Sequence, residues 1–338
     1  HYVKWMKTKS QNVEKKNFIM FSLCKHRLLT TAVKSKSKSV RAESNRANSF
    51  SRAFPSSKSL PLTYFSSWFC PFAHRATIAL EHHHIEYEWV EALGWEKQKP
   101  TGDEEFDAKE RKDWFYHHKS PALLSANPLG MIPTIQSHDK KDVVTESLVC
   151  VEFADEIGGG AYPTLLSRNP WHAARERVAA MNVNKQVTSN YYAVLVRTDL
   201  EERAAAFDKL VAGLRVFASE LENEGFWGGR GTLGFVDVAL FPYAWRLYVL
   251  EHFRGFNVPR SGEMGLWENY HSWLLRVSAL DYVHSTLPDK NKYLKHVAKY
   301  ANDQARSKVG NATRRGVSAL DYDDDIDAEN AHDNQCNE

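Results

Sequence analysis

One cysteine stands directly before a proline, where a short apolar run meets a helix-like pattern. Residues 64–75 read YFSSWFCPFAHR, which places Cys70 at the expected end of a strand and Pro71 at the first position of a helix. Unpaired backbone N–H groups and the helix dipole converge at such a position and favour a thiolate. We therefore expect Cys70 to be a reactive thiol with a lowered pKa, and not a small apolar residue of the core.

The residue three positions after Cys70 decides how such a thiol would turn over. Dithiol oxidoreductases carry a second, resolving cysteine there, but this sequence has Ala73. A mixed disulfide on Cys70 therefore needs an external thiol for its release, and glutathione is the abundant candidate. Ser66 and Ser67 are an alternative, as hydroxyl groups that could activate a bound thiol, but Cys70 has the better helix-terminal position.

Two further motifs could hold a small ligand. In GMIPTI (130–135), Pro133 begins a strand, which is tolerated if a turn, often through a cis bond, leaves the backbone of Ile132 free for a ligand. In TES (145–147), Glu146 and Ser147 close a strand and open a helix, so Ser147 could cap that helix and its N–H groups could hold a carboxylate. Each motif also has a plain structural interpretation, an edge-strand proline and a simple cap.

The elements that must position these residues follow from the apolar periodicity. Residues 60–66 and 85–93 are predicted as strands, 131–137 and 143–147 as a hairpin, and 71–83 and 147–157 as helices. Cys150 lies on the apolar face of the second helix and should be inert. Residues 94–125 predict an extended loop with a helical piece near 106–115. The order predicts an α/β thioredoxin-like N-terminal domain at 59–160.

Strand signals nearly vanish after residue 161. Residues 203–222 are amphipathic at helical spacing, and 236–253 are apolar almost all round, which predicts a buried central helix bent at Pro242. Residues 266–280 and 292–309 supply further helices. We expect an all-α C-terminal helical domain at 161–312.

Both ends of the chain have a biased charge and no apolar periodicity. Residues 1–58 carry fourteen Lys and Arg against two Glu, and the end of the segment 313–338 is strongly acidic. We expect both segments to be disordered. The basic leader could be a transit peptide or an artefact of the gene model. We expect a cytoplasmic protein, and a mitochondrial or other organelle location is the alternative if the leader is a transit peptide.

Several function classes are not expected. Four scattered cysteines without a CxxC pair argue against a disulfide scaffold or a structural zinc site. The sequence has no run of about 18 consecutive apolar residues, so we expect no transmembrane helix. The basic leader lacks interleaved aromatic residues, so we expect no nucleic-acid partner. We expect no metal at His82, His83 and His84, because adjacent side chains on a helix point in different directions.

Taken together, FCPFAHR, NPLGMIP, TES and the helical second half resemble the cysteine-type glutathione transferases over residues 60–310, most closely the Omega class. The resemblance implies the glutathione transferase fold, a homodimer, and glutathione as co-substrate. It implies that Cys70 is the catalytic thiol. The glutathione contacts that it implies are Phe69, Pro71, Lys99, Ile132, a cis Pro133, Glu146 and Ser147.

Some positions leave alternatives open. Lys99, in KQKP, resembles the Lys-Pro context of the family and is favoured over Lys119 for the glycyl carboxylate of glutathione. His74 replaces the Glu or Gln that is usual in Omega proteins and resembles the Xi class, the glutathionyl-hydroquinone reductases. In GFVD (234–237), Asp237 matches the capping box of the family, but Gly234 replaces its hydroxyl residue. Residues that could line the pocket for the second substrate are Tyr191, Tyr192, Trp245 and Tyr248.

The mechanism that the resemblance implies is thiol transfer. The Cys70 thiolate attacks a small glutathionylated or electrophilic substrate and becomes a mixed disulfide with glutathione, which a second glutathione releases. The alternatives are the Xi-type reductase and a non-catalytic scaffold with the same fold.

Overall fold

The computed structural model describes residues 62–97, 113–160, 162–221 and 225–321. Four of the expectations lie partly or wholly outside these residues. They are the basic leader at 1–58, the contact at Lys99, most of the helical piece at 106–115, and the acidic tail from residue 322 onward.

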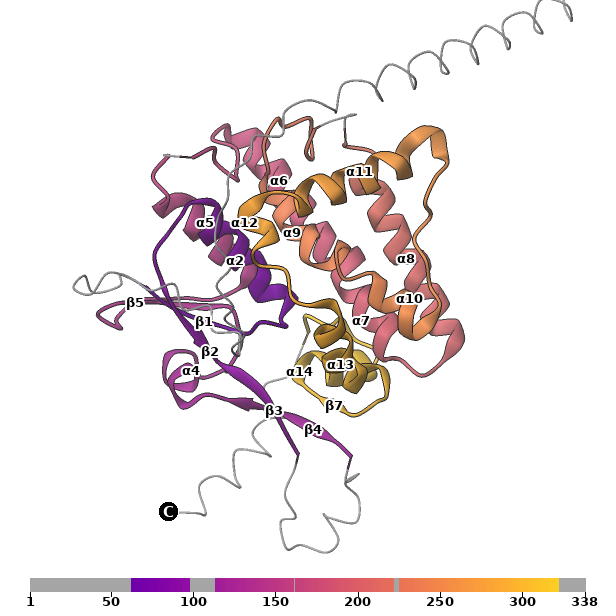
Figure 1. Cartoon of the computed structure of the whole chain (residues 1–338), viewed down its shortest axis with the longest axis horizontal. Helices are drawn as coiled ribbons and strands as arrows, with labels where there is room; N and C mark the ends of the chain where they lie inside the picture. Colours follow the sequence, from indigo (N-terminus) through magenta and orange to yellow (C-terminus); the bar gives the residue numbers. More distant parts are fainter. Residues whose placement is uncertain (1–61, 98–112, 161, 222–224, 322–338) are drawn as a thin grey trace, which may run out of the picture. The chain divides into compact units, whose positions relative to one another are not determined.

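The first sheet carries the ends of the strands that lead to the predicted site. β1 (Leu62–Ser66) lies between a parallel β2 (Glu88–Glu91) and an antiparallel β5 (Thr134–Ser137), and β5 pairs with β6 (Val143–Val144) in the expected hairpin (Figure 1). In this register Phe65 faces Thr134. The end of β1 therefore lies beside the turn that contains Pro133.

Two helices of this half pack on each other, as Figure 1 shows. α2 (Pro71–His82) begins after the Cys70 N-cap, and α5 (Ser147–Ile157) ends at Gly158. The Tyr64 hydroxyl of β1 donates a hydrogen bond to the carbonyl oxygen of Ala73 at 2.6 Å, which ties the first turn of α2 to the sheet. Both helices, and the buried position of Cys150, are as predicted.

The expectation of an extended loop after residue 94 was wrong. β3 (Leu93–Lys97) pairs antiparallel with β4 (Phe115–Lys119), and β4 pairs in parallel with β7 (Ala305–Arg306), which forms a second sheet. Phe115 is thus in a strand and not in a helix. The strands are stabilised by packing from the helical half, since the Trp95 ring lies 5.6 Å from the rings of both His296 and Tyr300. A short helix, α4 (Pro121–Ala126), follows β4.

The rest of the chain is almost entirely helical. Its elements are α6 (Pro170–Val183), the π-helix η1 (Asn184–Thr188), α7 (Ser189–Val196), α8 (Leu200–Ala218), α9 (Phe235–Ala244), α10 (Tyr248–Arg254), the 3-10 helix η2 (Glu263–Gly265), α11 (Leu266–Ser278), α12 (Asp281–His284), α13 (Lys290–Ala301) and α14 (Lys308–Arg314). No helix among the described residues is long and apolar enough to cross a membrane.

The boundaries in this half differ from the prediction in three places. The apolar stretch at 236–253 forms two helices, α9 and α10, and Pro242 lies inside α9 and not at the break. The helix expected at 292–309 ends at Ala301, and β7 follows it. The expected boundary at residue 312 lies within α14, and Ala319 beyond it is buried in the core.

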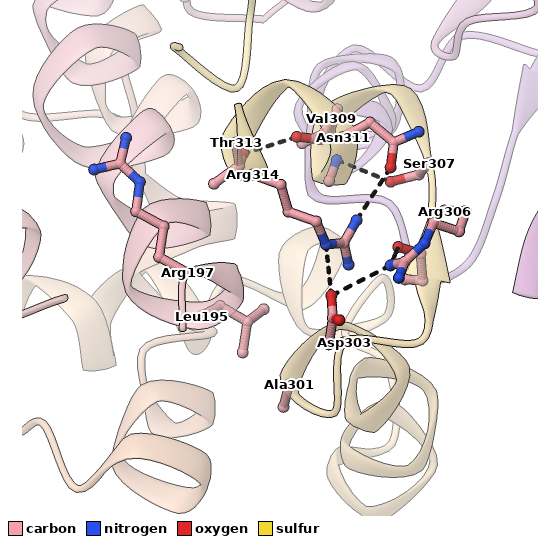
Figure 2. Close-up of polar contacts among 12 residues, drawn as sticks. Leu195, Arg197, Ala301, Asp303, Arg306, Ser307, Val309, Asn311, Thr313 and Arg314 are labelled. Atoms are coloured by element: carbon pink, nitrogen blue, oxygen red, sulfur yellow. Dashed lines mark hydrogen bonds and ion pairs between the residues drawn. The ribbon is translucent and has the colours of Figure 1, made fainter. Parts of the chain in front are cut away.

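The segment after α13 is held in place by charged and polar contacts around Asp303. Figure 2 shows the Asp303 carboxylate between two guanidinium groups, with Oδ1 at 2.7 Å from Nε of Arg314 and 3.3 Å from Nη1 of Arg306. Ser307 caps α14 by accepting a hydrogen bond from the N–H of Gly310 at 3.1 Å. These contacts position β7 for its pairing with β4.

Candidate functional site

Cys70 is the N-cap residue of α2, as predicted. Its backbone is extended, with φ −76° and ψ 117°, and its Sγ accepts a hydrogen bond from the N–H of Ala73 at 3.5 Å. The N–H of Cys70 donates to the carbonyl oxygen of Ser67 at 3.0 Å, which fixes the turn between β1 and α2. The side chain is partly exposed. The sulfur thus lies at the helix end where backbone donors are available.

The charge state of this thiol differs from the prediction. Burial raises the pKa of Cys70, and the backbone N–H groups of Ala73 and Phe72 and the guanidinium groups of Arg246 and Arg75 lower it by less. The helix terminus therefore acts in the expected direction, but desolvation is the larger effect. The predicted lowering of the Cys70 pKa was therefore wrong, and the protonated thiol is favoured over the thiolate.

The two neighbours of Cys70 are both buried. Phe69 is stacked on the His296 ring of α13, with ring centroids 3.9 Å apart. Pro71 is the first residue of α2. A cavity of about 370 Å³ opens beside Phe69 and Trp68 and is bordered by lysines of α13. The α13 helix therefore packs against the residue that precedes Cys70, a placement that no pattern in the sequence predicted.

The Ile132–Pro133 peptide bond is cis, as the resemblance implied. The turn before it is held by Asn127, whose Nδ2 donates to the carbonyl oxygen of Met131 at 3.2 Å and to Oγ1 of Thr134 at 3.1 Å. Ile132 belongs to a small apolar cluster against which Cys70 packs. The structure therefore brings Ile132, and with it the cis bond to Pro133, close to Cys70.

The side chain of Lys119 lies beside this turn. A Cβ atom added at Gly130 would meet the Cδ atom of Lys119 at 2.4 Å, so the lysine side chain lies against the turn. Lys99, the favoured glycyl contact, is outside the described residues. The choice between the two lysines stays a prediction.

Glu146 and Ser147 stand at the start of α5, but Ser147 does not cap it. Glu146 is the N-cap residue, and it has the uncommon backbone angles φ 66° and ψ 123° for a residue other than glycine. Such a conformation is retained where the surrounding structure enforces it, often at a ligand site. The Ser147 hydroxyl instead accepts a hydrogen bond from Nη1 of Arg75 at 3.1 Å.

Arg75 connects the two halves of the site. Its guanidinium is fully buried and donates to Ser147, to the carbonyl oxygen of Ala239 in α9 at 2.8 Å, and to Oγ1 of Thr188 at 3.2 Å. All three acceptors are neutral. Arg75 therefore fixes α2 against both α5 and the helical half, and it leaves a positive charge near Cys70.

The helical half contributes a cluster of aromatic side chains. Tyr191 and Tyr192 are buried in α7, and the Tyr192 ring is stacked parallel to Phe72 at 6.2 Å. Tyr192 interacts electrostatically with Cys70. Trp245 is partly buried, with the guanidinium of Arg246 5.5 Å from its ring. The predicted pocket residues thus lie on the helical side of the site, together with four that we did not single out: Tyr243, Arg246, Tyr293 and Tyr300.

His74 points away from the expected glutathione contacts. Its Nδ1 lies 3.1 Å from Nη1 of Arg246, and its Nε2 lies 2.8 Å from Oγ1 of Thr286. Since an arginine can only donate, Nδ1 is the acceptor, and Nε2 carries the proton that is donated to Thr286. Burial holds the pKa of His74 well below its usual range, so the ring is neutral. His74 therefore links α2 to the helical half.

The remaining candidate residues have structural contacts. His82 bonds to the carbonyl oxygen of Pro163 at 2.8 Å, and His83 bonds to Oδ1 of Asp155 at 2.8 Å. Within the described ranges no three such side chains come together at metal-binding distances. Ser67 donates its hydroxyl proton to the Glu91 carboxylate.

Comparisons with known proteins found similarity to glutathione transferases. Residues 69–157 match the model for the glutathione S-transferase N-terminal domain. The chain is 28% identical to glutathione transferase GST 23 of Zea mays over 227 residues, which cover 67% of this chain and 89% of that protein. It also resembles the crystal structure of rice GST1 in complex with glutathione, with a TM-score of 0.56 and 27% identity over 73% of this chain and 99% of that one. The structure of glutathione transferase Omega 3C from Trametes versicolor has the same TM-score of 0.56, at 23% identity, over 72% of this chain and 91% of that one.

Proposed function

The chain carries the N-terminal domain of the glutathione S-transferase family and has the glutathione transferase fold, and we propose that it catalyses glutathione-dependent thiol transfer at Cys70. Glutathione transferase function is the broader conclusion, which the relatives support. The Omega-type thioltransferase activity is the narrower proposal. A homodimer and a cytoplasmic location are further proposals, which light scattering and a fluorescent fusion of the full chain would test.

The observation that carries the proposal is the position of the Cys70 sulfur. It accepts the N–H of Ala73 at the start of α2, and Ala73 leaves no second thiol in the resolving position. Both Arg75 and Arg246 favour its thiolate form. A thiolate held by fixed backbone donors and positive charge is a suitable nucleophile and leaving group for disulfide exchange.

The reaction takes place in two exchanges. First, the Cys70 thiolate attacks the glutathione sulfur of a mixed disulfide, the S–S bond breaks, and the substrate sulfur leaves as a thiolate that takes up a proton from water. Second, the thiolate of another glutathione attacks the glutathione sulfur bound to Cys70. Glutathione disulfide leaves, and the Cys70 thiolate is restored. The cis Pro133 turn and the Glu146–Ser147 junction are the elements that we propose for holding glutathione.

A second candidate is conjugation of glutathione to an electrophile, without a covalent step on Cys70. It is favoured by the raised pKa of Cys70, because a protonated thiol is a poor nucleophile. In this alternative the thiol of Cys70 would only stabilise the thiolate of bound glutathione. Ser67 is not available for that role, because its hydroxyl proton is donated to Glu91. An Xi-type reduction of glutathionyl-hydroquinones is a variant of the thiol-transfer proposal with a different substrate.

Variants of Cys70 separate these candidates. In Cys70→Ala we expect the reduction of the mixed disulfide of glutathione and 2-mercaptoethanol to fall by about 100-fold or more, because the nucleophile is gone. Cys150→Ala is the matched control, since Cys150 is buried in α5 away from this chemistry, and its rate should be close to that of the wild type. Full disulfide reduction by Cys70→Ala would refute thiol transfer. Retained conjugation of 1-chloro-2,4-dinitrobenzene in the same variant would favour the second candidate.

A further inference from the structure

Arg246 is a buried cation without an anionic partner in the described structure. It lies between α9 and α10 and is 0% exposed. Its Nη1 donates to the carbonyl oxygen of Pro242 at 2.8 Å and to Nδ1 of His74 at 3.1 Å, and both acceptors are neutral. Its Nε and Nη2 atoms are buried and have no well-aligned hydrogen-bond partner among the described residues. Burying an unpaired charge is costly, so this arrangement calls for an occupant.

The unoccupied edge of the guanidinium has a specific geometry. Nε and Nη2 lie on the same edge and can donate in parallel to the two oxygens of one carboxylate. Two exposed arginines of this chain use the same edge in this way. Arg177 binds Glu152 through Nε at 3.0 Å and Nη2 at 2.7 Å, and Arg215 binds Glu263 at 2.7 and 2.9 Å. In Arg246 the corresponding pair of donors faces no carboxylate of the described chain.

Among the described residues, the surroundings of Arg246 add further donors and no buried acid. The hydroxyls of Tyr243 and Tyr248 are buried and have no hydrogen-bond partner. Burial raises the pKa of both hydroxyls, and the charge of Arg246 lowers it by less. The Tyr293 ring lies 4.8 Å from the guanidinium. Burial raises the pKa of the Tyr293 hydroxyl, and the charge of Arg246 and a hydrogen-bonding contact with it act in the opposite direction, so Tyr293 is a neutral polar neighbour of the guanidinium. Asp289, which interacts with Tyr248, is exposed and already caps α13 through the N–H of Lys292 at 2.8 Å.

This group of donors belongs to the neighbourhood of Cys70. Arg246 hydrogen-bonds His74, which is one helical turn after Cys70, and its charge acts on the Cys70 thiol. A carboxylate bound to Arg246 would therefore be close to the sulfur. Since Arg246 and its tyrosines come from the helical half, they are not on the elements that we propose for glutathione, which are the cis Pro133 turn and the start of α5.

We propose that Arg246, assisted by the Tyr248 hydroxyl, binds the carboxylate of the small co-substrate that exchanges with Cys70. The protein would thus prefer acidic thiol or disulfide substrates to neutral ones. This inference rests on the proposed thiol transfer. Glutathione also carries carboxylates. The carboxylate on Arg246 could therefore come from the co-substrate or from glutathione, and the experiment has to distinguish the two.

Two mixed disulfides of glutathione make a matched pair of substrates, one with 3-mercaptopropionic acid and one with 2-mercaptoethanol. They differ only in a carboxylate and a hydroxyl. In Arg246→Met both disulfides lose the help that the positive charge gives to the Cys70 thiolate, so the ratio of their kcat/KM values is the measure. We expect the acidic-to-neutral ratio to fall by about tenfold or more, and an unchanged ratio would overturn the inference. Arg246→Lys should recover little, because an ammonium group has no parallel pair of donors. Arg177→Met, on an exposed ion pair, is the control.

The outcomes separate the possibilities. An equal loss for both disulfides together with a raised KM for glutathione would assign the carboxylate to glutathione and overturn the inference, as would no loss for either. If Arg246→Met does not fold, as judged by circular dichroism, then Arg246→Lys and Tyr248→Phe decide the question by the same ratio of the two substrates.

A binding measurement separates this inference from the proposed function. The unreactive thioethers S-(2-carboxyethyl)glutathione and S-(2-hydroxyethyl)glutathione can be compared by calorimetry in the wild type and in the Arg246 variants. A preference of the wild type for the acidic thioether that Arg246→Lys abolishes would support the inference even if neither disulfide is turned over. Equal binding of the two thioethers by the wild type would overturn it.

Discussion

Replacing Asp237 by asparagine should change the stability of the protein in a way that depends on pH. Asp237 is fully buried near the start of α9, where it forms the predicted capping interaction with Gly234. Its Oδ2 accepts the N–H of Gly234 at 2.9 Å, and its Oδ1 accepts the N–H of Trp227 at 3.0 Å and Nε1 of Trp273 at 2.7 Å. An asparagine could keep the two bonds to Oδ1, but its amide nitrogen would face the N–H of Gly234.

The magnitude follows from the shift in the pKa. Burial raises the pKa of Asp237 from 3.8 to about 6, and the hydrogen bonds from Trp227, Gly234 and Trp273 oppose this by less. The folded protein therefore binds this proton more tightly than the unfolded chain. The stabilisation is fully present below about pH 4 and is lost as the pH rises through 6, which amounts to about 3 kcal/mol at about 1.4 kcal/mol per pKa unit. Loss of the Gly234 bond costs the variant about 1–2 kcal/mol at every pH.

Urea unfolding of the wild type and of Asp237→Asn between pH 4 and pH 7 would test this reasoning. Near pH 4 the wild type has both the Gly234 bond and the proton-linked stabilisation, so we expect the variant to be less stable there by about 4 kcal/mol. This deficit should shrink by about 3 kcal/mol toward pH 7, to roughly the 1–2 kcal/mol of the Gly234 bond. The difference between the two proteins isolates Asp237 from the other carboxyl groups. A deficit that stays constant or grows with pH would show that the ionised carboxylate is stabilised in the folded protein, and the argument from burial would be wrong.

Two further changes test the second sheet and the turn before Pro133. Asp303→Ala should lower the free energy of unfolding by about 1–3 kcal/mol, because it leaves the largely buried Arg314 without its carboxylate, and thermal unfolding would measure the loss. An unchanged melting temperature would contradict it. Gly130→Ala should cost about 1–2 kcal/mol, since Gly130 has φ +60° and a Cβ there would lie 2.4 Å from Lys119 Cδ. Urea unfolding measures this, and a neutral effect would mean that the turn adapts.

The sequence predicted those elements whose apolar periodicity is local. α5 and α8 bury residues at helical spacing along one face. Pro71 marks the start of α2, Gly158 follows the end of α5, and β1 is a short, mostly buried apolar run. β3 and β4 were missed because charged and histidine side chains interrupt the apolar pattern of both strands. The elements that stabilise them are α13 and the two-residue strand β7, which lie far along the chain. No local pattern in the sequence reveals a pairing of that kind.

The motifs of the site could be predicted from the sequence, but the burial and the charged neighbours of Cys70 could not. The positions of Cys70 and the cis Pro133 follow from the neighbouring residues in the sequence. The pKa of Cys70 depends on burial, which tertiary packing produces, and on Arg75 and Arg246, of which Arg246 is far along the chain. In the same way, the sequence around Ser147 predicts a helix cap, but in the structure the Ser147 hydroxyl accepts a hydrogen bond from Arg75 instead.

The pairing of β4 with β7 has a consequence for the order in which the chain is made. The side chains of Asp113 and Gln304, which flank this pairing, are joined across 191 residues of sequence by a hydrogen bond of 3.2 Å. On the ribosome, β3 and β4 are therefore complete long before their third strand exists. During that time β4 has an unpaired edge, which is the kind of surface that recruits other strands. The nascent chain can close this edge only when residues 305–306 emerge, so the thioredoxin-like half is finished by a segment from the far end of the protein.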